Sequence, residues 1–98
     1  MSAYWINLFL EIRDPAKVAA YAELATPAIA EAGGRFLARG MPEAVFEHGR
    51  ESRSVIIEFP SMDSARKWYH CAEYQEALKI RKAHSSGNVI LTEGLPAG

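Results

Sequence analysis

The sequence predicts a small α+β domain in which strands and helices follow one another as β-α-β-β-α-β. Stretches rich in aromatic and β-branched residues alternate with two segments of helical periodicity, and each helical segment begins at a capping residue, Asp14 or Ser61. The length of 98 residues allows one domain, residues 1–98. The composition, 49% hydrophobic and 23% charged, is typical of globular proteins. For so small an interior the apolar share is high, so we expect a partner chain to cover part of it.

The first strand is expected at Tyr4 to Ile12 (YWINLFLEI). Alternation along the strand gives two faces, and both carry large apolar side chains. The two sets are Tyr4, Ile6, Leu8, Leu10 and Ile12 on one face, and Trp5, Asn7, Phe9 and Glu11 on the other. Apolar residues on both faces are typical of a strand that is covered on both sides.

The first helix is expected to begin at Asp14 as N-cap, with Pro15 as its first residue. Apolar residues at helical spacing continue from Val18 to Ala32. Pro27 lacks a backbone N–H and is therefore expected to kink or interrupt this helix. The pair Gly33-Gly34 is expected to end it.

Two further strands are expected to form a hairpin. Residues 35–38 (RFLA) have strand character, which residues 40–42 (GMP) interrupt and residues 44–47 (AVFE) continue, as one bulged strand or two short strands. The turn is expected at 48–51, and the third strand at Ser54 to Phe59 (SVIIEF).

The second helical segment is expected to start after Ser61. Its phase slips at 70–73, and a further helical segment extends to Arg81. A loop at 85–88 and a short last strand at 89–91 then complete the chain. The β-α-β-β-α-β order is the ferredoxin-like pattern, whose four-stranded antiparallel sheet has the first and third strands in its centre.

Two helices can cover only one face of such a sheet. The other apolar face therefore needs a second cover, and we predict a homodimer formed through this sheet face. The alternative is a monomer with exposed apolar side chains.

Charge and motifs narrow the class of protein. The formal net charge of −1 and the pI of about 6.3 predict no nucleic-acid or membrane partner. The single cysteine, Cys71, excludes an intrachain disulfide, and with no signal-peptide pattern it favours a cytoplasmic location. The three histidines are scattered, so neither a metal nor another cofactor is predicted. Cys71 is expected to be a small, unreactive packing residue, and the alternative is a reactive thiol.

Four stretches resemble the domain-of-unknown-function 1330 (DUF1330) family: RFLARG at 35–40, VIIEFPSMDSARKWY at 55–69, EYQEALKIRK at 73–82 and VILTEG at 89–94, with YWI at 4–6. The resemblance covers nearly the whole chain. It implies the dimeric alpha-beta barrel superfamily, in which two ferredoxin-like sheets pack face to face. That superfamily includes small monooxygenases, haem proteins, isomerases and dehydratases, so the resemblance implies a fold and a dimer but no particular activity.

Two charged residues are the candidates for catalysis. If the hairpin turns around Gly49, then Arg39 and Glu58 lie nearly opposite on neighbouring strands. A cross-strand ion pair is one interpretation. The other is a pocket in which Arg39 holds a carboxylate or enolate, and Glu58, with a pKa raised towards neutrality, transfers a proton.

Further polar and aromatic side chains are expected to line a pocket between the sheet and the helices. These predicted ligand-binding residues are Asn7, Tyr21, Trp68, Tyr74 and Arg81. The competing interpretation of the aromatic residues is that they pack in the core. The competing interpretation of Arg81 is that its side chain is exposed.

The leading functional hypothesis is that a homodimer binds a small carboxylate or aromatic molecule. An extension of this hypothesis is that the homodimer acts on that molecule as a cofactor-independent enzyme. The alternative is a non-catalytic structural or regulatory dimer whose sheet face serves only assembly. A third hypothesis, haem or metal chemistry, has no supporting ligand pattern. A cavity between sheet and helices separates the first hypothesis from the second, because a structural module needs none.

Overall fold

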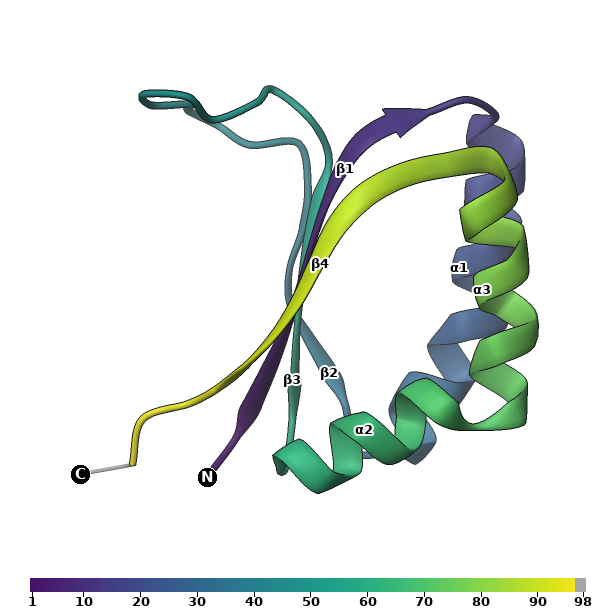
Figure 1. Ribbon diagram of the computed structural model, residues 1–98, viewed down its shortest axis with the longest axis vertical. Coiled ribbons are helices and arrows are strands. Elements are labelled where there is room, and N and C mark those ends of the chain that lie inside the picture. Colours follow the sequence, from purple (N-terminus) through teal and green to yellow (C-terminus); the bar gives the residue numbers. More distant parts are fainter. Residues whose placement is uncertain (97–98) are drawn as a thin grey trace.

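The computed structural model describes residues 1–96 and contains the predicted order of elements, with the second helical segment divided in two (Figure 1). The elements are β1 Ala3–Ile12, α1 Pro15–Glu31, β2 Arg35–Gly40, β3 Ser54–Phe59, α2 Met62–His70, α3 Ala72–His84 and β4 Ser85–Glu93. The strands pair antiparallel in the order β2-β3-β1-β4. The α+β ferredoxin-like fold, with the first and third strands in its centre, is therefore confirmed.

All three helices lie on one side of the sheet (Figure 1). The side of β1 that carries Trp5 and Phe9 faces the helices and is buried, as are Ile57 and Phe59 of β3. The other side of β1 carries Ile6 and Leu8, and no helix covers it. We call this second side of the sheet the open face. Both sides of β1 carry apolar side chains, but the helices bury only one of them.

The first helix begins at Pro15 and ends just before Gly33-Gly34, both as predicted, and it runs between them without a break. The Asp14 carboxylate accepts a hydrogen bond from the backbone N–H of Lys17 at 3.3 Å, with Pro15 in the first turn. The expected interruption at Pro27 is wrong, because the helix continues to Glu31. Pro27 lies on the exposed side of α1, where water can satisfy the carbonyl that loses its N–H partner.

The connection between β2 and β3 is a long loop, residues 41–53. The strand expected at 44–47 is absent, because β2 ends at Gly40, whose φ of 141° is open to glycine alone. The tight turn also comes earlier than the predicted 48–51, since the N–H of Gly49 donates to the carbonyl of Phe46 at 2.9 Å.

The last strand is longer than the sequence indicated. The predicted loop at 85–88 is wrong: these residues pair with β1, from Ser85 opposite Ile12 to Asn88 opposite Leu8. At Gly87 a Cβ would come within 2.7 Å of the Leu8 carbonyl oxygen, so the close pairing of β4 with β1 requires glycine there.

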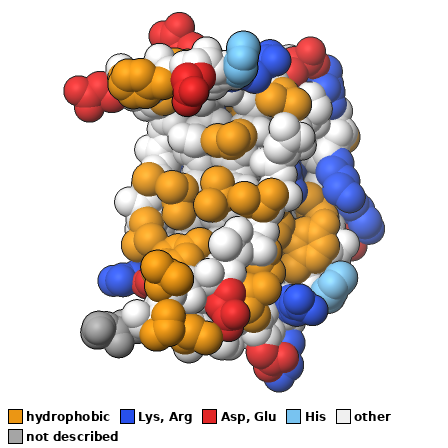
Figure 2. Space-filling model, turned by 60° about the vertical axis from the view of Figure 1, so that its left-hand side comes forward, with side chains coloured by type: hydrophobic (Ala, Val, Ile, Leu, Met, Phe, Trp, Pro, Cys, Tyr) orange, Lys and Arg blue, Asp and Glu red, His pale blue; other side chains and the backbone are white. Residues whose placement is uncertain are grey.

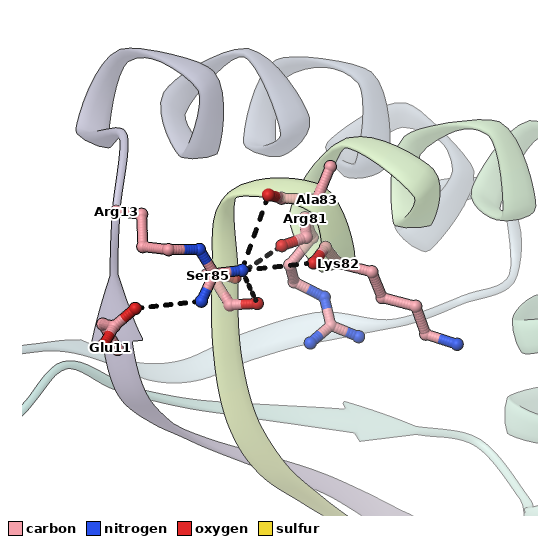
Figure 3. A network of polar contacts seen from close by, with 6 residues as sticks. All are labelled: Glu11, Arg13, Arg81, Lys82, Ala83 and Ser85. Carbon is pink, nitrogen blue, oxygen red and sulfur yellow. Dashed lines mark hydrogen bonds and ion pairs between the residues drawn. The ribbon is translucent and has the colours of Figure 1, made fainter.

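Arg13 joins the end of β1 to the end of α3 (Figure 3). Its backbone N–H donates to the His84 carbonyl at 2.8 Å, and its guanidinium donates to the Ser85 carbonyl at 3.1 Å. Longer contacts reach the carbonyls of Lys82 and Ala83. These carbonyls have no helical partner, so Arg13 provides the donors that the end of a helix lacks.

The predicted phase slip between α2 and α3 is a break at Cys71. Cys71 has an extended backbone, and its sulfur accepts a weak hydrogen bond from the Tyr74 N–H at 3.5 Å. The break lets α2 and α3 direct Trp68 and Tyr74 to the same place, where their ring centroids lie 4.1 Å apart. Both are almost completely buried against β1 and β3.

Among residues 1–96 the chain has no helix of the length and apolarity that a membrane span requires.

The cap of α2 is open to a direct test. The Ser61 hydroxyl oxygen accepts from the Ser64 N–H at 3.1 Å. Ser61→Ala should therefore lower the free energy of unfolding by about 1 kcal/mol, measured by urea denaturation. Ser61→Asp keeps an acceptor and should remain near the native value; equal losses in both variants would show that the cap is not the cause.

Candidate functional site

A cavity of about 400 Å³ lies between α1 and the half of the sheet formed by β1, β3 and β2. Its walls are mostly apolar: Trp5, Phe9, Ile12 and Val18, with Ala22, Ala25 and Ile29 from α1 and Phe36, Val55 and Ile57 from β2 and β3. The small side chains of α1 leave this space open, because alanines cannot reach across to the sheet. The volume falls in the range of small-molecule sites.

Five polar residues also line this cavity: Asn7, Tyr21, Thr26, Arg39 and Arg53. Asn7 is only 3% exposed, and its amide oxygen has no hydrogen-bond partner among residues 1–96. Arg39 lies with its guanidinium 4.4 Å above the ring of Phe36 and forms no ion pair within the same residues. The cavity thus combines an apolar body with one unpartnered amide and two cations.

Three of the predicted ligand-binding residues form a polar chain beside the cavity. The hydroxyl groups of Tyr21 and Tyr74 are 2.9 Å apart, and the Arg81 guanidinium donates to the Tyr74 hydroxyl at 3.5 Å. Burial is the main cause that raises the pKa of both tyrosines, while the nearby Arg81 charge partly opposes it. Of the three, only Tyr21 lines the cavity.

The other predicted pocket residues lie elsewhere. Trp68 and Tyr74 are core residues, 2% and 0% exposed, which is the packing role that competed with ligand binding. Arg81 is buried rather than exposed, and it lines a separate groove. The structure therefore brings together Asn7, Tyr21 and Arg39 of the predicted set. Whether any of these residues binds a ligand stays a prediction.

The expected pairing of Arg39 with Glu58 is wrong. Arg39 lies opposite Val55, and Glu58 lies opposite Arg35. The turn comes earlier than Gly49, and β2 contains a bulge between Phe36 and Ala38, so the register of the hairpin moves by several residues.

Glu58 lies on the side of the sheet away from the cavity. Its carboxylate accepts from the Arg35 guanidinium at 2.7 Å and from the Tyr4 hydroxyl at 3.0 Å. The hydrogen bond from Arg35, followed by that from Tyr4, lowers the pKa of Glu58, contrary to the expected rise towards neutrality. A carboxylate held ionised in this way is a weak base, so proton transfer by Glu58 stays a prediction that its contacts do not favour.

Arg53 was missed as a cavity residue. Alternation backwards from Val55 places residue 53 on the same side of β3, so the period of the strand was the signal that could have found it. The alternation was applied only within the predicted strand, and Arg53 directly precedes that strand.

The remaining candidates form no reactive cluster. Within residues 1–96, no group of three or more His, Cys, Asp or Glu side chains is placed to hold a metal ion. The cavity lining contains no carboxylate, histidine or cysteine. Cys71 caps α3 outside the cavity.

The family model described as "Domain of unknown function (DUF1330)" matches residues 2–95. Among solved structures, a protein of unknown function from Rhodopseudomonas palustris has a TM-score of 0.77 at 21% identity, covering 98% of this chain and 84% of the other. The cofactor-independent oxygenase SnoaB from Streptomyces nogalater has a TM-score of 0.68 at 15% identity, over 98% and 95%. A dimeric ferredoxin-like protein from Bacteroides fragilis has a TM-score of 0.55 at 16% identity, over 95% and 96%. A search among curated proteins finds no match.

These neighbours are similar to the chain in fold, and their identities are too low to carry over more than that. A four-stranded ferredoxin-like sheet is common to proteins of unknown function and to an oxygenase. The fold is therefore compatible with several activities, and function must be argued from the cavity itself.

The buried tyrosines predict an alkaline loss of stability. Because the folded-state pKa values of Tyr21 and Tyr74 lie above the ordinary 10.0, the unfolded chain ionises first as the pH rises. Their contribution is fully present below pH 10.0 and is lost above it. Urea unfolding at increasing pH should show this decline, and Tyr21→Phe should reduce it. Equal declines in both proteins would contradict the assignment.

Proposed function

Because the chain belongs to the DUF1330 family, a domain family without an assigned activity, we propose its function from the cavity beneath α1. The cavity binds a small, mainly apolar molecule that carries a carboxylate or another anionic group. Each protomer of a homodimer holds one such site. Within this proposal Asn7 and Tyr21 contact the body of the ligand, and Arg39 with Arg53 binds its anionic group.

The single observation that carries the proposal is the open cavity itself. Protein interiors are normally filled to crystal-like density, so a space of about 400 Å³ beside fully packed aromatic residues is unusual for a purely structural core. It also separates the hypotheses, since a module that serves only assembly needs no such space. The non-catalytic structural dimer is therefore the weaker candidate.

Specific polar groups support an anionic, partly aromatic ligand. The amide oxygen of Asn7 is buried without a donor, and a ligand hydroxyl or amino group would satisfy it. Arg39 and Arg53 contribute positive charge without a carboxylate among the lining residues. A planar guanidinium can hold a carboxylate through two parallel hydrogen bonds.

An enzymatic role extends this proposal and is not required by it. The likeness to a cofactor-independent oxygenase makes cofactor-free oxidation of the bound molecule the reaction class to examine first. The lining residues include no carboxylate or histidine that could act as a conventional general base. Binding is therefore the primary claim, and turnover is a separate measurement on the same ligand.

The homodimer is proposed to form through the open face. Figure 2 shows hydrophobic side chains across the middle of this face and charged ones mainly towards its rim. Leu8, Leu37 and Ile90 are 47%, 47% and 56% exposed. The loop 41–53 and the last described residues extend outwards on the same side (Figure 1), so a second sheet would lie between them. The dimeric neighbour supports association into a dimer. A cytoplasmic location remains a prediction.

The binding proposal can be tested with 2-naphthoate, an aromatic carboxylate whose binding is followed by calorimetry. Arg39→Ala should weaken binding about ten-fold or more, since a charge-assisted hydrogen bond contributes about 1.5–3 kcal/mol. Val55→Trp fills the cavity and should abolish binding while circular dichroism shows an intact fold.

Two control variants belong to this experiment. Arg35→Ala removes an arginine from the same strand but from the other side of the sheet, and it should leave binding unchanged. Glu58→Gln should also have no effect, because Glu58 lies outside the cavity. If native protein fails to bind 2-naphthoate and a panel of similar aromatic acids at millimolar concentration, the proposal is wrong.

Assembly is tested separately by analytical ultracentrifugation. Leu8→Arg places a charge in the centre of the open face and should convert the native dimer to monomers. Leu24→Arg is the matched control, because Leu24 is 53% exposed but lies on α1, away from the sheet. Native protein that sediments as a monomer at micromolar concentration would refute the dimer.

A further inference from the structure

A second groove, of about 500 Å³, lies beneath α2 and α3 on the β4 side of the sheet. Trp5 borders both this groove and the cavity beneath α1. The groove is lined by Trp5, Arg66, Tyr69, His70, Arg81, Lys82, Ser85, Ser86, Gly87, Val89, Ile90 and Leu91. The proposed function does not involve this space.

The lining of the groove is strongly cationic. Arg66, Arg81 and Lys82 contribute three positive charges, and the lining includes no carboxylate. None of the three forms an ion pair with an Asp or Glu in the described part of the chain. The neighbouring lysines outside the groove do: Lys67 pairs with Asp63, and Lys79 pairs with Glu76. The groove is thus lined by three positive charges that no carboxylate of residues 1–96 pairs with.

Arg81 is the buried member of this set. It is only 7% exposed, and its Nε has no hydrogen-bond partner among residues 1–96. Its other contacts are neutral: the Tyr74 hydroxyl at 3.5 Å and the face of the Tyr21 ring at 5.5 Å. In Figure 3 its guanidinium points away from the Arg13 cluster and contacts none of the residues drawn. A buried guanidinium without a counter-anion is costly, and an anionic ligand would compensate that cost.

We propose that this groove is a second ligand site, which binds the phosphate group of a small molecule through Arg81, Arg66 and Lys82. Three cations with no acidic neighbour favour a dianion over a monocarboxylate. A guanidinium fork matches the geometry of phosphate oxygens. The apolar wall formed by Trp5, Tyr69 and Leu91 suits a flat or apolar body attached to that phosphate.

Calorimetry on the native protein tests the site with phenyl phosphate, inorganic phosphate and benzoate. Phenyl phosphate should bind most tightly, because it supplies both the dianion and a ring for the apolar wall. Inorganic phosphate should bind more weakly, and benzoate most weakly at this site. Binding of phenyl phosphate should fall steeply with added salt.

Substitutions assign the binding to the groove. Arg81→Gln should weaken phenyl phosphate binding about ten-fold or more, and Arg66→Ala and Lys82→Ala should each weaken it several-fold. Lys79→Ala is the matched control on α3, because Lys79 is exposed and paired with Glu76; it should bind as the native protein does. Phenyl phosphate binding is also measured in Val55→Trp, whose filled cavity beneath α1 leaves the groove as the site of the binding that remains.

Two results would overturn the proposal. One is no detectable binding of phenyl phosphate by the native protein at millimolar concentration. The other is binding that the Arg66→Ala, Lys82→Ala double variant retains in full. This double variant changes only exposed side chains, so it decides the question even if Arg81→Gln does not fold.

Discussion

The packing of Trp5 against Trp68 is the contact on which the helical side of the molecule depends. Their ring centroids lie 4.8 Å apart in an edge-to-face arrangement, and Trp68 also packs on Phe59 and Tyr74 at 4.8 and 4.1 Å. This aromatic cluster attaches α2 and α3 to the centre of the sheet. Trp5 lies on the central strand β1, and it lines both the cavity beneath α1 and the groove beneath α2 and α3.

The two cavities differ in chemistry because different helices cover them. The alanine-rich face of α1 leaves an apolar space with Arg39 and Arg53 in its wall. The helices α2 and α3 place Arg66, Arg81 and Lys82 around a groove without acidic residues. A hydrogen-bonded chain runs from the Tyr21 hydroxyl through the Tyr74 hydroxyl to the Arg81 guanidinium and connects the two spaces. A change at Arg81 is therefore expected to reach the wall of the first cavity.

The one-sided helical layer also explains the open face. Three helices on one side leave Ile6, Leu8 and Ile90 without cover, although the central strands are apolar on both sides. A large exposed apolar surface favours association, and an isologous contact between two such sheets would bury both surfaces together. Glu58 and Arg35 lie on this side, so their ion pair is on the open face and not at the cavity.

Local signals in the sequence determined the order of the elements, the caps at Asp14 and Ser61, and the third strand at Ser54–Phe59. Each of these signals acts within a few residues, so it can be recognised from the local sequence alone. The tertiary structure alone decided the partner of Glu58, the paired start of β4 and the separation of Arg81 from Arg39. These features depend on register and packing: an early turn and one bulge changed every cross-strand neighbour of β2, and no local pattern specifies where such shifts fall.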